Sequence, residues 1–161
     1  MIIWIASYPK SGNTWLRSLL SSYFFSKDGI FSFKQLENIK QFSSRSLIST
    51  EINQLNYQSV VSKNWIPMQE IINKDKKIHF LKTHNAICSI NGNPFTNKKN
   101  TIACIYIVRD PRNVITSLSN HYNLKIDESL DFIKSDRKII FPYKKKIKNL
   151  NEFNFISSWA N

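Results

Sequence analysis

The chain of 161 residues is long enough for one domain with a sizeable core, and its 42% hydrophobic content is that of a globular protein. Its formal net charge of +12 favours anionic ligands or surfaces. Basic clusters at residues 74–77 and 144–148 lack the aromatic pattern of nucleic-acid-binding modules, so we expect no nucleic-acid partner.

The two cysteines and the short apolar runs indicate the cellular location of the protein. Cys88 and Cys104 have no CxxC spacing and no histidine at metal-ligand spacing, which is typical of reduced packing residues inside the cell. The N-terminal apolar run covers only residues 2–6, and no later run approaches the roughly 20 residues of a membrane span. We therefore expect a cytoplasmic protein without stable membrane insertion.

The N-terminal stretch predicts a strand, a polar loop and a helix. Residues 2–6 form a short apolar run, typical of a strand buried on both faces of a parallel sheet. Residues 7–12 contain proline, glycine and small polar residues, and a helix is expected from residue 13 to about 25. The expected buried stripe of that helix is Trp15, Leu16, Leu19, Leu20, Tyr23 and Phe24.

This arrangement predicts a phosphate or sulfate site at residues 8–15, because a helix N-terminus presents free backbone N–H groups and a positive dipole end. Lys10 adds a cation, and Gly12 allows close approach of the backbone. The order of residues differs from the nucleotide-binding pattern G-x-x-x-x-G-K-[ST], because Ser7 stands five residues before Gly12 and Asn13 follows it. No Mg²⁺ ligand is evident. An ordinary turn with a solvated lysine is the alternative.

The middle of the chain predicts a second strand that ends near a histidine. Residues 30–62 are expected to form short helices and loops, and residues 65–73 a helix with Pro67 in its first turn. Residues 78–81 form a strand candidate that runs into Lys82-Thr83-His84. Since ligands collect beyond the carboxyl ends of parallel strands, we expect His84 at the same edge as the anion loop. A structural or merely exposed histidine is the alternative.

Residues 101–108 are the clearest strand candidate. Asp110 and Pro111 after it are typical of a helix N-cap and first helical position. Arg109 could form a fork of hydrogen bonds with a phosphate; the alternative is a surface ion pair of Asp110 with either Arg109 or Arg112. The expected buried stripe of this helix is Val114, Ile115, Leu118 and Tyr122.

Three segments together resemble the sulfotransferases that use 3′-phosphoadenylyl sulfate (PAPS). The sequence YPKSGNTW at residues 8–15 resembles their 5′-phosphosulfate loop, and residues 109–117 resemble their 3′-phosphate motif. Residues 82–84 match the segment that carries their catalytic histidine. The resemblance implies a three-layer α/β fold with a parallel sheet, similar to P-loop kinases and NTPases.

The resemblance also implies a role for each matching residue. Lys10 and His84 would be catalytic: Lys10 stabilises charge on the leaving oxygen, and His84, near its normal pKa, takes a proton from an acceptor hydroxyl or amine. Trp15 would pack on the adenine, although it also fits the buried stripe of the first helix. With Lys10, the residues implied to bind PAPS are Ser11, Gly12, Asn13, Thr14, Trp15, Arg109 and Ser117. No metal is implied.

The sequence departs from the family pattern in three places. Asn13 stands where threonine is common, and Asn85-Ala86 stands where Leu-Pro often follows the histidine. Residues 154–161 resemble the start of the family's tryptophan-containing mid-domain helix, and the family's late Gly- and Lys-rich segment has no counterpart after them. We therefore expect residues 1–161 to be a single partial sulfotransferase domain, its N-terminal two-thirds, whose activity in isolation stays open.

Two other functions remain open from the residues alone. A non-catalytic binder of anionic nucleotides or nucleic acid would use the basic surface without chemistry, and a kinase-like P-loop enzyme would bind ATP with Mg²⁺. The acceptor could be a sugar, a lipid headgroup or another small molecule. The oligomeric state is not indicated.

Overall fold

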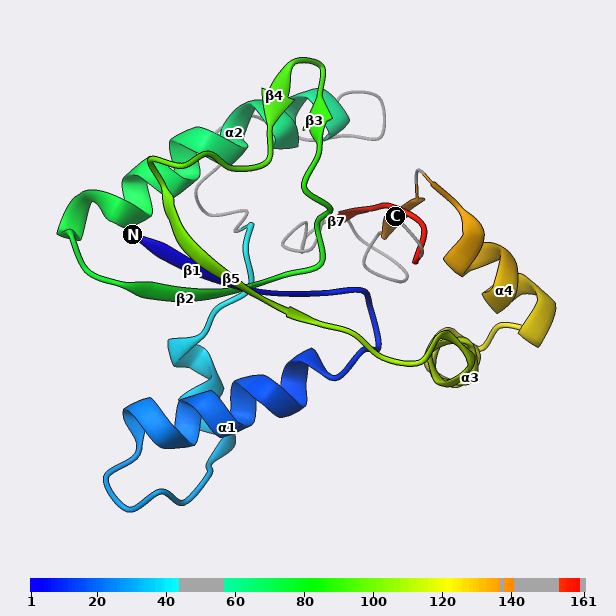
Figure 1. Ribbon diagram of the computed structural model, residues 1–161, viewed down its shortest axis with the longest axis horizontal. Coiled ribbons are helices and arrows are strands. Elements are labelled where there is room, and N and C mark those ends of the chain that lie inside the picture. The colour runs from blue at the N-terminus through cyan, green and yellow to red at the C-terminus, as the bar shows by residue number, and fades with distance from the viewer. Residues whose placement is uncertain (44–56, 137, 141–153, 160–161) are drawn as a thin grey trace.

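The computed structural model describes residues 1–43, 57–136, 138–140 and 154–159 (Figure 1). Its centre is a parallel three-stranded sheet in the order β2-β1-β5, formed by β1 (Ile2–Ser7), β2 (His79–Thr83) and β5 (Thr101–Ile107). Helix α1 (Asn13–Phe25) lies on one side of this sheet and helix α2 (Tyr57–Ile72) on the other (Figure 1). The three-layer α/β fold expected from the sequence is confirmed.

Smaller elements surround this centre. Helices α3 (Pro111–Tyr122) and α4 (Ile126–Lys134) follow β5 and lie beyond its carboxyl end (Figure 1). The remaining elements are the 3₁₀ helices η1 (Phe33–Asn38) and η3 (Asn73–Asp75), the hairpin β3 (Ser89–Ile90) and β4 (Asn93–Pro94), and the antiparallel pair β6 (Lys138–Ile140) and β7 (Asn154–Ile156).

Two expected helices differ from the structure. Residues 154–156 form strand β7 instead of the start of a helix, because their backbone pairs with β6 and also bonds the loop after β2: Ala86 N–H donates to the Phe155 carbonyl at 2.8 Å. Helix α2 begins at Tyr57, so Pro67 lies inside it and not in its first turn. The apolar face of α2 already includes Val61, and packing of that face extends the helix toward the N-terminus.

The register of the sheet aligns the carboxyl ends of the three strands. Ala6 lies opposite Thr83, and Ser7 lies opposite Ile107. Strand β1 is the central strand, and five of its six residues are buried, as expected. The segments that follow these strands therefore begin at one edge of the sheet.

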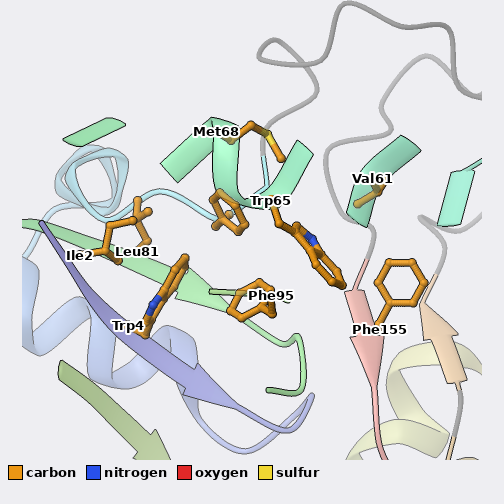
Figure 2. Close-up of a cluster of buried hydrophobic side chains, with 9 residues drawn as sticks. Ile2, Trp4, Val61, Trp65, Met68, Leu81, Phe95 and Phe155 are labelled. Carbon is orange, nitrogen blue, oxygen red and sulfur yellow. The ribbon is translucent and has the colours of Figure 1, made fainter. Parts of the chain in front are cut away.

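The main core fills the space between the sheet and α2. The fully buried Trp65 and Met68 of α2 face Trp4 of β1, whose ring lies 5.1 Å from that of Phe95 (Figure 2). The side-chain amide of the buried Gln69 is hydrogen-bonded at both ends inside this layer: its Nε2 donates to the Phe95 carbonyl, and its Oε1 accepts from the Thr96 hydroxyl. The cluster consists of Ile2, Trp4, Phe42, Val61, Trp65, Met68, Leu81, Phe95 and Phe155.

The opposite layer is far less covered. The stripe expected to be the buried face of α1 is largely exposed: Trp15 is 70% exposed and Tyr23 80%. Individual side-chain contacts hold this helix against the rest of the protein. Among them are the stacked rings of Phe24 and Phe80 of β2, and hydrogen bonds from Arg17 to carbonyls of the η1 region. The periodicity predicted the helix correctly, but its burial was predicted wrongly.

The strand and helix expected after residue 100 are both present. Strand β5 lies at one edge of the sheet, and most of its side chains, such as that of Tyr106, are exposed. Helix α3 begins as expected: the Asp110 carboxylate accepts from the Arg112 N–H, and Pro111 is the first helical residue. Its buried Val114 and Leu118 pack in a second cluster with α4 and β7. No helix among the described residues is long and apolar enough to cross a membrane.

Candidate active site

The loop between β1 and α1 is a tight turn that presents unsatisfied donors. Ser11 N–H bonds the Tyr8 carbonyl at 3.2 Å, and Gly12 has a φ of +102°, a conformation that favours glycine. No side chain caps the start of α1, so its first backbone N–H groups are free to bind an anion. The Ser11 hydroxyl is buried and has no hydrogen-bond partner within the described residues. This donor set fits a phosphate or sulfate group.

Two cationic residues, one in this loop and one hydrogen-bonded to it, contribute positive charge. Lys10 itself forms no ion pair in the described part of the chain. Arg109 follows β5, and its Nη1 donates to the Lys10 carbonyl at 2.9 Å. Of the two surface pairs named as alternatives, Arg112 with Asp110 is formed, at 2.5 Å, whereas the described residues show none between Arg109 and Asp110. Hydrogen bonds from Arg112 lower the pKa of Asp110 to about 2.

His84 stands directly beyond β2 and contacts the end of β1. Its Nδ1 lies 2.8 Å from the Ser7 carbonyl oxygen and 3.2 Å from Ser7 Oγ. Its backbone N–H donates to Asn154 Oδ1 at 3.3 Å, which ties the segment to β7. The structure therefore brings His84 and the loop to one edge of the sheet, as the order of the segments predicted.

The electrostatic surroundings of His84 differ from the expectation of a normal pKa. Burial is the largest effect, and the charge of Lys82 is the next; together with the weaker effects of Arg17 and Lys10 they lower the pKa of His84 to about 4. The hydrogen bond to Ser7 opposes this shift only partly. The imidazole is consequently neutral at pH 7, a state in which one ring nitrogen keeps a lone pair.

Asn13 has a side chain that points to the sheet. It is 4% exposed, and its Nδ2 donates to the Ile5 carbonyl at 3.0 Å and to Ser7 Oγ at 3.1 Å. Its backbone N–H lies in the uncapped first turn of α1, where it is available to an anion. Sequence reasoning treated Ser7 only as the first residue of the loop and gave Asn154 no role. No local pattern marks either contact, although Ser7 at the end of a buried strand is one weak signal.

The remaining predicted residues lie around the loop with fewer contacts. Trp15 is exposed in the first turn of α1, so the alternative that places it in the core is wrong. Thr14 is also exposed, beside it. Ser117 is half-buried in the second turn of α3, and none of the hydrogen bonds described above for the loop and His84 involves it.

A hollow of about 1370 Å³ lies on the α2 side of the sheet. Its lining includes Ala6, Thr83 and Tyr106 from the three strands, and it reaches the loop at Tyr8 and Ser11. The hollow therefore borders the loop, and His84 is not among the residues that line it.

Comparison with protein families gives one result. A family model described as "Sulfotransferase domain" matches residues 2–156, which include the loop, His84 and the segment from Arg109 to Ser117. The chain belongs to the sulfotransferase family. Comparison with curated proteins finds no match. Membership of this family indicates that the protein transfers sulfuryl groups, without specifying the donor or the acceptor.

Proposed function

We propose that this sulfotransferase transfers the sulfuryl group of PAPS to a hydroxyl or amine of a small-molecule, sugar or lipid acceptor. One observation carries the proposal: the loop is hydrogen-bonded to both of its expected functional neighbours. Ser7, at the start of the loop, bonds His84, and the Lys10 carbonyl bonds Arg109. A base, a lysine and an arginine therefore meet at the uncapped start of a helix, an arrangement suited to an anionic group-transfer substrate.

The residues of the loop fit the charged end of PAPS. The free N–H groups of the first turn of α1 and the Ser11 hydroxyl would bind the 5′-phosphate. Thr14 adds a hydroxyl in the same turn. Arg109 would bind the 3′-phosphate together with Ser117, and the exposed ring of Trp15 would pack on the adenine.

The transfer needs charge stabilisation and one proton acceptor. PAPS, when bound, supplies the sulfuryl group and a bisphosphate leaving group. Lys10 would stabilise the negative charge that develops on the bridging oxygen as its bond to sulfur breaks. His84 would accept the proton of the acceptor group through its unprotonated ring nitrogen as that group bonds to sulfur. No metal is required in this scheme.

The cellular setting and partners follow the same proposal. We assign the protein to the cytoplasm, which agrees with two cysteines that are both free. The high positive charge serves the anionic substrate in this proposal, and nucleic acid is not a partner.

Calorimetric titration with 3′,5′-adenosine bisphosphate, the product that PAPS leaves behind, tests the proposal. Saturable binding is expected, and Lys10→Ala and Arg109→Ala should each weaken it at least about tenfold, because each removes a charge-assisted contact. Lys34→Ala, which removes an exposed lysine from η1, is the matched control and should leave the affinity unchanged.

Other ligands separate the alternatives. Tighter binding of ATP with Mg²⁺ than of the bisphosphate would contradict the proposal in favour of a kinase-like enzyme. Binding of nucleic acid that weakens steeply with salt, without bisphosphate binding, would favour a non-catalytic binder of anions. A folded protein that binds the bisphosphate equally well with and without Lys10 would exclude the loop as the site.

A further inference from the structure

The amide of Asn13 is oriented by its contacts. The Ile5 carbonyl oxygen can only accept a hydrogen bond, so the Asn13 atom 3.0 Å from it must be the NH₂ group. The second hydrogen of the same group points to Ser7 Oγ at 3.1 Å. Both hydrogens of Asn13 are therefore used to hold the end of β1.

The end of β1 in turn determines which nitrogen of His84 carries the proton. Nδ1 lies 2.8 Å from the Ser7 carbonyl oxygen, which can only accept a hydrogen bond, and 3.2 Å from Ser7 Oγ, which can accept or donate one. With the proton on Nε2, the lone pair of Nδ1 would instead face the lone pairs of that carbonyl at the same short distance. The geometry therefore favours a proton on Nδ1, shared between two oxygens of one residue.

We propose that Asn13 and Ser7 are positioning residues that hold His84 in the Nδ1–H tautomer and leave the lone pair of Nε2 free for the acceptor's proton. The use of that lone pair in catalysis rests on the proposed function, whereas the tautomer itself does not. Asn13 then acts at two sites: its backbone N–H belongs to the anion loop, and its side chain aligns the base.

This arrangement makes the anion loop and His84 one hydrogen-bonded unit. Asn13, Ser7 and His84 come from α1, β1 and the segment after β2, and they are joined without a bridging solvent molecule. Asn13 and Ser7 are 4% and 3% exposed, so water competes little for these bonds. A displacement of Asn13 is therefore transmitted to the imidazole through Ser7.

The tautomer can be measured directly by NMR. Protein labelled with ¹⁵N in its histidines gives long-range ¹H–¹⁵N correlations that distinguish a protonated from an unprotonated ring nitrogen, and His84→Gln assigns the signal of His84. At neutral pH we expect the proton on Nδ1. Asn13→Ala should shift the tautomer ratio toward Nε2–H by about fivefold, the effect of one hydrogen bond. Asn38→Ala, at the exposed end of η1, is the matched control.

The outcomes separate the inference from the proposed function. If Asn13→Ala fails to fold, Ser7→Ala removes a single oxygen and should shift the ratio in the same direction. A proton on Nε2 in the unmodified protein, or an unchanged ratio in every folded variant, would overturn the inference even if the bisphosphate binds. An Nδ1–H tautomer that depends on Asn13, in a protein that does not bind the bisphosphate, would support the inference and contradict the proposed function.

Discussion

Helices α1 and α2 cover opposite faces of the same sheet, yet they differ in what their side chains do (Figure 1). In α2 one apolar face is buried, with Val61, Trp65 and Met68 fully inaccessible to solvent. In α1 the most deeply buried residues are Asn13 and Ser21, whereas Trp15 and Tyr23 are exposed. One helix thus stabilises the core, and the other carries a polar site at its N-terminus.

This difference shows what an apolar stripe can predict. A stripe at helical spacing predicts that a helix forms, because that spacing places the residues on one face. Whether the face is buried depends on which elements pack against it. Residues from β1, β2 and the loop after β4 pack against α2, whereas α1 is attached mainly through Asn13, Arg17 and Phe24.

The largest expected effect tests the α2 side. Trp65→Ala should lower the free energy of unfolding by about 3–5 kcal/mol, because it leaves a cavity between Phe95 and Phe155, whose rings both lie 5.4 Å from the indole. Tyr23→Ala on α1 should change it by less than about 0.5 kcal/mol. Urea unfolding measures both. Similar losses in the two variants would contradict the contrast between the helices.

A smaller effect, dependent on pH, tests the α1 side. His84 has its pKa lowered from 6.5 to about 4, so between these values the unfolded chain binds a proton that the folded chain does not. The stability should therefore fall as the pH is lowered from 6.5 to about 4, by up to roughly 3 kcal/mol for this residue. His84→Gln should flatten this part of the stability profile, measured by urea unfolding at each pH.

Ligand binding sharpens the same prediction. The cations Lys82, Arg17 and Lys10 help to keep His84 neutral, and a bound bisphosphate would offset their charge. The pKa of His84 should therefore rise when 3′,5′-adenosine bisphosphate binds, which an NMR titration of the ring follows. A pKa that stays the same at saturation would mean that the anion binds away from His84.

The smallest effect on stability is expected at Trp15. Since this residue is 70% exposed, Trp15→Ala should leave the free energy of unfolding nearly unchanged. The affinity of the Trp15→Ala variant for 3′,5′-adenosine bisphosphate should be about tenfold lower than that of the unmodified protein if the indole stacks on the adenine. Leu19→Ala, an exposed apolar residue of the same helix, is the control. Unchanged calorimetric affinity in Trp15→Ala would remove this residue from the binding site.

Local signals account for most of what the sequence predicted correctly. The change from an apolar run to helical spacing near residue 13 predicted β1, the loop and α1, and Asp110-Pro111 predicted the start of α3. The edge of the sheet where the loop, His84 and Arg109 meet was also predicted. It follows from a general rule, that parallel strands present their carboxyl ends together.

Contacts between distant residues account for what was missed. Asn154 lies 70 residues from His84, and its strand β7 was expected to be helical because nothing local indicates the partner strand β6. The pKa of His84 was expected to be normal, since a sequence does not show how deeply an imidazole is buried or which cations face it. The exposure of the β5 side chains was not predicted either, because it depends on which elements pack against that strand.

The sequence by itself determined the order of β1, α1, α2, β2, β5 and α3, the residue types of the anion loop and the membership of the sulfotransferase family. These depend on short-range spacing, which a linear pattern contains. Only the tertiary structure decided that Asn13 turns its amide to Ser7 and that Ser7 bonds His84. Such bonds join three separate segments, and their geometry exists only after the sheet has brought those segments together.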